Sequence, residues 1–173
     1  MAYPQSANVV SSMGSDFKDV FNSGRPDIWH TATENESFPL YQNRGGGVFF
    51  EVTDQSLLGG TRNMSGWSNG IFDFDNDGWK DLFAARGNVL DNVALMSSRT
   101  YEERNSVFRN LGNGRFRDVS TDAGPDFLQA APHRGAAFGD IDNDGRVDAV
   151  VTVLNGPVKY FTIRHRAGIT GFC

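Results

Sequence analysis

The stretch "DFDNDGWKDL", residues 73–82, indicates how this chain folds. It places four aspartates within nine residues around a central glycine, and "DIDNDGRVDA", residues 140–149, repeats the arrangement 67 positions later. Four like charges at this spacing repel one another strongly unless a cation neutralises them. Carboxylates at positions 1, 3, 5 and 9 can converge on one point if the backbone curls around it, and glycine at position 6 permits the sharp turn.

This oxygen-only ligand set predicts one Ca²⁺ ion in each loop. Calcium accepts six to eight oxygen ligands at ~2.3–2.6 Å in flexible geometry, whereas Mg²⁺ demands a stricter octahedron. In the first loop the predicted ligands are the carboxylates of Asp73, Asp75, Asp77 and Asp81 and the backbone carbonyl of Trp79. In the second loop they are the carboxylates of Asp140, Asp142, Asp144 and Asp148 and the backbone carbonyl of Arg146. The alternative is a pair of solvated acidic turns.

Two other calcium-binding motifs do not fit the sequence. An EF-hand requires a bidentate Glu at position 12 and flanking helices, but position 12 is Ala84 in one loop and Val151 in the other. The segment after the second loop, "VDAVVTVLNG", is rich in β-branched residues and predicts a strand. Cys173 is the only cysteine, which excludes thrombospondin-type repeats and an internal disulfide framework.

The charge distribution supports a metal site and argues against nucleic-acid binding. The net charge is −5, and the two loops hold eight of the 21 acidic residues. Two bound divalent ions would therefore bring the formal charge to −1. The basic residues are scattered and the pI is about 5.1, unlike a nucleic-acid footprint. No apolar run approaches the ~20 residues that a membrane-spanning helix needs, and the N-terminus does not resemble a signal peptide.

The similarity between the two halves extends beyond the loops. "YQNRGGGVFFEVT" (41–53) matches "FRNLGNGRFRDVS" (108–120) without a gap, and "WSNGIFDFDNDG" (67–78) matches "RGAAFGDIDNDG" (134–145), all at the offset of 67. Short strands that recur in this order, joined by glycine-rich turns, predict an all-β fold of β-propeller blades. Each blade would have four antiparallel strands, with the aspartate loop in a hairpin.

A degenerate copy precedes these two units. "DVFNSGRPDI" (19–28) keeps Asp19, Gly24 and Asp27, but Phe21 and Ser23 replace two of the carboxylates. We expect this loop to keep its shape and to bind calcium weakly or not at all. The second unit also contains an insertion, residues 88–104, which lacks strand alternation and predicts a short helix or an ordered loop on the binding face.

The quoted motifs resemble a known family. "FDFDNDGWKDLF" and "GDIDNDGRVDAVV", each with the pattern F/Y-x-N-x-G-x-G-x-F, resemble the FG-GAP/VCBS repeats of β-propellers. The longer sequence pattern, over about residues 13–161, resembles the bacterial ASPIC/UnbV group, which is related to cartilage acidic protein. The resemblance implies a propeller, usually of seven blades, with Ca²⁺ in the hairpin loops of secreted or cell-surface proteins. The eight loop aspartates are the implied calcium ligands.

These observations predict a partial propeller of two to three blades, as part of a longer propeller protein or a truncated one. We expect an N-terminal segment (1–12) that is a candidate for disorder, three repeat units (about 13–60, 61–127 and 128–161) and an atypical tail (162–173). The predicted function is non-enzymatic extracellular or periplasmic adhesion, recognition or assembly, with calcium in a structural role. Partners would be a protein or glycan ligand, further blades, or another copy through open strand edges. The alternatives are the propeller part of an enzyme or biosynthetic accessory protein, or a glycan-binding module.

Overall fold

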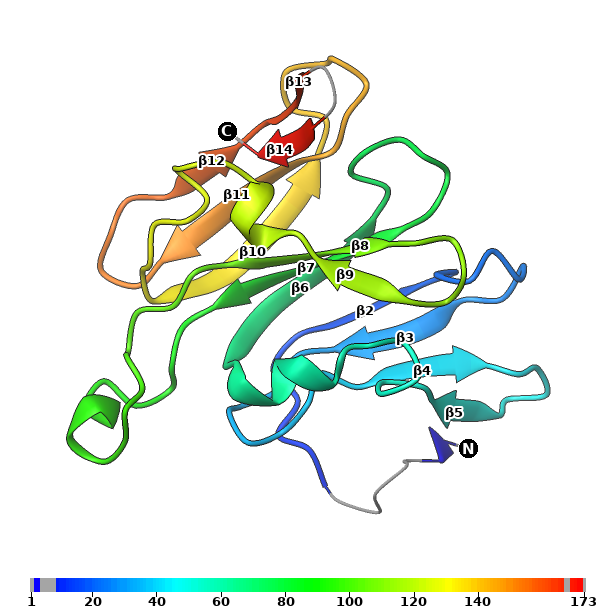
Figure 1. Ribbon diagram of the computed structural model, residues 1–173, viewed down its shortest axis with the longest axis horizontal. Helices are drawn as coiled ribbons and strands as arrows, with labels where there is room; N and C mark the ends of the chain where they lie inside the picture. The colour runs from blue at the N-terminus through cyan, green and yellow to red at the C-terminus, as the bar shows by residue number, and fades with distance from the viewer. Residues whose placement is uncertain (1, 4–8, 167–168, 173) are drawn as a thin grey trace.

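The computed structural model describes residues 2–3, 9–166 and 169–172. In this part of the chain there is no α-helix, and the strands form three consecutive sheets and one separate hairpin (Figure 1). The second and third sheets have four and three antiparallel strands, and the first has four antiparallel strands and one short parallel strand; four-stranded antiparallel sheets are typical of propeller blades. The predicted all-β, blade-like fold is therefore confirmed. Within the same residues, no helix has the length and apolar character to cross a membrane.

The first sheet follows the order β1-β5-β4-β3-β2. Its strands are β1 (Ala2–Tyr3), β2 (Ser15–Lys18), β3 (Asp27–His30), β4 (Leu40–Asn43) and β5 (Phe49–Glu51). Strands β2 to β5 are antiparallel neighbours in sequence order, while β1 pairs with β5 in parallel and covers part of that edge. The expected N-terminal segment 1–12 lies partly outside the described residues, at 1 and 4–8.

The second sheet is a four-stranded meander, and the third has three strands. The short 3₁₀ turn η1 (Gly59–Asn63) leads into β6 (Gly66–Phe72), β7 (Asp81–Arg86), β8 (Ser106–Asn110) and β9 (Phe116–Asp118). A further 3₁₀ turn, η3 (Ser120–Asp122), precedes β10 (His133–Gly139), β11 (Asp148–Val153) and β12 (Lys159–Phe161). In the expected tail 162–173, β13 (Ile163–Arg166) and β14 (Ile169–Phe172) form a hairpin; residues 167–168 and 173 lie outside the description.

Strand β7 shows how the sheets pack. Its buried side chains alternate: Leu82 and Ala84 join a core with the first sheet, and Phe83 joins a core with the third. This period of two buries both faces of the middle sheet, which explains why the four central residues of the strand, 82–85, are apolar. The result is three sheets side by side, with the middle one enclosed (Figure 1).

The first strands of the sheets approach closely. A Cβ atom on Gly70 of β6 would lie 2.4 Å from the ring of Phe138 on β10, so only glycine lets the two strands come this near. On the other side of β6, the backbone N–H of Ile71 donates to Asp16 of β2 (2.8 Å). The ammonium of Lys18 lies 3.0 Å from the centroid of the Phe72 ring. Strand β6 is therefore held between β2 and β10.

The insertion 88–104 forms a loop that projects from the β7–β8 end of the middle sheet (Figure 1). The sequence predicted a short helix or an ordered loop for this segment. The structure has a loop that contains one 3₁₀ turn, η2 (Val93–Leu95). Its tip is apolar and solvated, since Leu95 is 86% exposed. The insertion therefore adds an accessible surface without disturbing the ladder between β7 and β8.

Candidate metal centre

Three hairpin loops have the same backbone conformation, and they link β2 to β3, β6 to β7 and β10 to β11. They comprise residues 19–26, 73–80 and 140–147. The fourth position is a left-handed asparagine in each: φ is 52° at Asn22, 56° at Asn76 and 58° at Asn143. The sixth position is a glycine with φ of 78°, 91° and 83° in chain order. Asparagine and glycine are the residues that enter this region at least cost, so the sequence N-x-G dictates the turn.

The first aspartate closes each loop by accepting two backbone hydrogen bonds. Asp73 accepts from the N–H groups of Asp77 (3.0 Å) and Gly78 (2.8 Å). Asp140 makes the equivalent pair of bonds in the third sheet, at 2.9 and 2.8 Å. The degenerate loop keeps them too, because Asp19 accepts from the fourth and fifth N–H groups after it, at 2.9 and 2.7 Å. The loop shape thus follows from the first aspartate and the turn residues.

The ninth aspartate is buried and joins the loop to a later strand. Asp81, at 2% exposed, accepts from the N–H groups of Phe74 (3.2 Å) and Asn110 (2.8 Å). Burial raises the pKa of Asp81 to about 7, against the opposing effect of these hydrogen bonds. Asp27 occupies the same position and accepts from the N–H groups of Val20 and of Asn43 on β4. Asp148 accepts from the N–H groups of Ile141 and, at 3.4 Å, of Ile163 at the start of β13. A buried carboxylate of this kind gains from a nearby cation.

The structure brings three aspartates together in each complete loop. Asp73, Asp75 and Asp81 each offer one carboxylate oxygen, and these oxygens all lie within 4.8 Å of one another; Asp140, Asp142 and Asp148 do the same. The side chain of Asp75 is 7% exposed, and its Oδ1 atom is buried without a hydrogen-bond partner. Burial raises the pKa of this carboxyl group. A hard cation would satisfy such an oxygen, so the donor set fits a metal ion.

The fifth aspartates point to other groups in this structure. Asp77 accepts from the N–H of Trp79 (2.9 Å) and pairs with the guanidinium of Arg109 (3.3 Å). In the third sheet, Asp144 accepts from the N–H of Arg146 (2.9 Å) and forms an ion pair with the same residue. The roles of Asp77, Asp144 and the carbonyls of Trp79 and Arg146 as ligands stay predictions.

Arg109 is a functional candidate that sequence reasoning missed. It lies on β8, and its Nε atom is 2.8 Å from Asp75 Oδ2, so its guanidinium partly neutralises the first cluster. The opposed charge lowers the pKa of Asp75, although burial has the larger effect. The matching position in the first unit is Gln42, so a comparison of the units could have marked Arg109 as unusual.

The two clusters differ in exposure. Asp140 and Asp142 are exposed, whereas Asp73 and Asp75 are partly buried. Desolvation, followed by the like charges of the neighbouring aspartates, raises the pKa of Asp142. The degenerate loop keeps two of the carboxylates, Asp19 and Asp27, and forms no cluster of three among the described residues.

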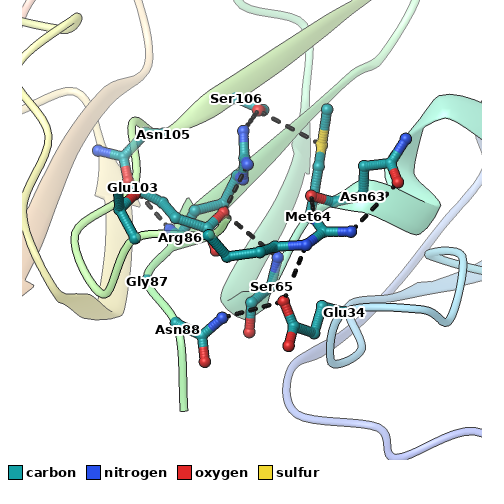
Figure 2. Close-up of polar contacts among 12 residues, drawn as sticks. Glu34, Asn63, Met64, Ser65, Arg86, Gly87, Asn88, Glu103, Asn105 and Ser106 are labelled. Carbon is teal, nitrogen blue, oxygen red and sulfur yellow. Dashed lines mark hydrogen bonds and ion pairs between the residues drawn. The ribbon is translucent and has the colours of Figure 1, made fainter. Parts of the chain in front are cut away.

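A polar network holds the base of the insertion at the opposite end of the sheets (Figure 2). Arg86 pairs with Glu103 at 2.5 Å, across the two ends of the insertion. Arg99 pairs with Glu34 of the first sheet's β3–β4 loop at 3.2 Å. The Arg86–Glu103 pair is largely shielded from solvent and the Arg99–Glu34 pair is partly exposed, and together they tie the insertion to the sheets.

The histidines with described side chains make structural contacts. His133 is fully buried, and its Nδ1 lies 3.1 Å from the carbonyl oxygens of both Arg86 and Glu103, so Nδ1 carries the proton. Burial lowers the pKa of His133 to about 4. His30 bonds to Ser12 and stacks on Tyr41. The side chain of His165 lies outside the description.

The fold and the paired acidic loops define a propeller-type blade with an aspartate-rich hairpin, and comparison with known proteins gives the family. The model of the FG-GAP-like repeat matches residues 19–84 and 88–151, which is most of the chain. The chain therefore belongs to the FG-GAP-like repeat family. It is also similar to cartilage acidic protein 1 of Mus musculus, at 42% identity over 60 residues. That match covers 33% of this chain and 9% of the mouse protein.

Proposed function

We propose that the chain is a calcium-stabilised, non-enzymatic recognition module of a β-propeller that acts outside the cytoplasm. The observation that carries this proposal is the pair of aspartate clusters, each at the same place in a blade. The match to FG-GAP-like repeats supports it, because such repeats are typical of extracellular and cell-surface proteins. The local match to cartilage acidic protein 1 favours the ASPIC/UnbV group within the wider family.

Calcium suits these loops better than other common cations. The donors are carboxylate oxygens in a flexible turn, without imidazole or thiolate, which favours a hard ion that tolerates irregular coordination. The ion would neutralise Asp75 and Asp142, while the first and ninth aspartates keep the loop folded. Affinity in the range of extracellular modules, ~10⁻⁴–10⁻³ M, would keep the sites occupied where calcium is abundant.

A non-enzymatic role fits the placement of the titratable groups. His133 is neutral, buried and directed at two backbone carbonyls, which suits packing and not proton transfer. Arg86 and Glu103 pair with each other at the base of the insertion. The insertion itself presents an apolar tip on a fixed base, which suits contact with a protein or glycan partner.

Calorimetric titration with CaCl₂ tests the proposal directly. The intact chain should bind two Ca²⁺ ions, and Asp142→Ala should abolish binding at the third sheet while leaving the other site. Asp91→Ala, which removes an exposed carboxylate from the insertion, is the matched control and should still bind two ions. Absence of binding at millimolar calcium would refute the metal role. Glycan-array screening of the same protein would identify a carbohydrate partner.

A further inference from the structure

The tips of neighbouring hairpin loops are joined by a hydrogen bond at one repeated position. The side-chain amide of Asn22 in the first loop donates to the carbonyl oxygen of Gly78 in the second loop (3.0 Å). Asn76 in the second loop donates in the same way to the carbonyl oxygen of Gly145 in the third loop (3.3 Å). Both asparagines have the left-handed backbone of the loop turn. The turn of one loop therefore sets where its asparagine meets the next loop.

The second of these bonds lies between the two aspartate clusters. Asn76 directly follows Asp75, a member of the first cluster whose buried Oδ1 atom has no hydrogen-bond partner. Gly145 accepts the bond from Asn76, and its own N–H donates to Asp140 of the second cluster (2.8 Å). One side-chain amide and one glycine thus connect a candidate ligand of the first ion to a candidate ligand of the second.

The bases of these loops are held without an ion. Phe74, the second residue of its loop, is 3% exposed, and the centroid of its ring lies 6.0 Å from that of Phe138, shortly before the third loop. The first and ninth aspartates of each loop accept hydrogen bonds from backbone N–H groups. Asn76 and Gly145, by contrast, are exposed at the loop tips. The tips are therefore the part of each loop whose position an ion can change.

We propose that Asn76 is a positioning residue that couples the two calcium sites, so that an ion in one loop raises the affinity of the other; this inference rests on the proposed calcium role. When Asp75 is held by an ion, the adjacent Asn76 is held with it. Its amide then fixes Gly145, whose N–H orients the carboxylate of Asp140. Coupling between binding sites is reciprocal, so both affinities rise by the same factor. Loss of one exposed hydrogen bond should weaken binding by about two- to fivefold.

Two glycine amides measure the two sites separately. The N–H groups of Gly78 and Gly145 donate to the first aspartates of their own loops, so each reports on its own loop in ¹H–¹⁵N spectra. A CaCl₂ titration of the full chain in 0.15 M NaCl, which screens repulsion between the ions, gives a midpoint for each amide. Asp75→Ala removes a ligand from the second sheet. The calcium concentration at the Gly145 midpoint should then rise by about two- to fivefold, although the third loop is unchanged.

Asn76→Gly tests the route of the coupling. Glycine keeps the left-handed turn and removes the amide, so the Gly145 midpoint should rise by the same factor. Adding Asp75→Ala to this variant should raise the midpoint no further, because the connection is already lost. Asn22→Gly, the same change in the first loop, is the matched control and should leave the effect of Asp75→Ala on Gly145 intact. Circular dichroism confirms the fold of every variant.

Three results would overturn the coupling, and they can be told apart. Equal Gly145 midpoints with and without Asp75→Ala would mean two independent calcium sites, and the proposed function would stand. An effect of Asp75→Ala that persists in full in Asn76→Gly would exclude Asn76 as the connection. A protein in which neither glycine amide responds to calcium would refute the calcium role and the coupling together.

Discussion

Calcium should raise the melting temperature of this protein, and two carboxylates should account for most of the rise. The critical residues are Asp75 and Asp142, because the first and ninth aspartates already hold the loop backbone through hydrogen bonds. Replacing Asp75 and Asp142 by Ala removes cluster ligands while it leaves those hydrogen bonds in place. The experiment therefore separates loss of the ion from loss of the loop.

The magnitude follows from ligand linkage. For a site with a dissociation constant of ~10⁻⁴–10⁻³ M, roughly 10 mM Ca²⁺ stabilises the folded state by about 1.4–2.7 kcal/mol. A chain of this size gains about 2–4 °C per kcal/mol, so each occupied site should add about 3–11 °C. We expect the third-sheet site to contribute the larger share, because Arg109 already neutralises part of the other cluster.

Differential scanning calorimetry in CaCl₂ and in EDTA measures the effect. Asp142→Ala should remove the larger part of the calcium-dependent rise, and the double variant with Asp75→Ala should reduce it to less than about 2 °C. Asp91→Ala controls for the change in net charge and should keep the full rise. The reasoning would be refuted by equal melting temperatures of the unmodified protein in calcium and in EDTA. A double variant that keeps its calcium response would refute the assignment of these ligands.

Three further predictions concern neighbouring groups. Arg109→Gln should raise calcium affinity at the Asp75 cluster by about fivefold, since a competing cation is removed; an unchanged titration would contradict this. His133 has a folded-state pKa of about 4, below its unfolded value of 6.5, so its contribution to stability is complete above pH ~6.5 and is lost as the pH falls toward 4. Denaturant unfolding at several pH values measures the free energy of unfolding. As the pH falls from about 6.5 toward 4, this free energy should decrease by up to about 3 kcal/mol less in His133→Asn, which keeps a donor to the carbonyls, than in the unmodified protein. Parallel curves of unfolding free energy against pH would contradict this. Gly70→Ala should destabilise the chain by about 1–3 kcal/mol because its methyl group meets the ring of Phe138, whereas Gly60→Ala, which meets nothing within 4 Å, should cost much less.

The loops and the blades could be predicted from the sequence because their causes are local. A left-handed asparagine, a glycine two residues later and aspartates at positions 1 and 9 dictate the hairpin loop, and all of them lie within nine residues. The loop with Phe21 and Ser23 shows this, because it keeps the same hydrogen bonds without the central carboxylates. The repeat offset then reveals where each sheet begins, since every blade reuses the same short pattern.

Only the tertiary structure decided how the charges within a loop are used and which surfaces are open. Local spacing treats Asp75 and Asp77 alike, but in the folded chain Asp75 joins the cluster and Asp77 accepts from the Trp79 amide. Arg109, from a later strand, pairs with both carboxylates. The same spacing makes Phe74 and Ile141 equivalent, yet one is buried by the next sheet and the other is solvated. Burial and long-range ion pairs depend on which sheets lie together in space, and a pattern of neighbouring residues does not contain that information.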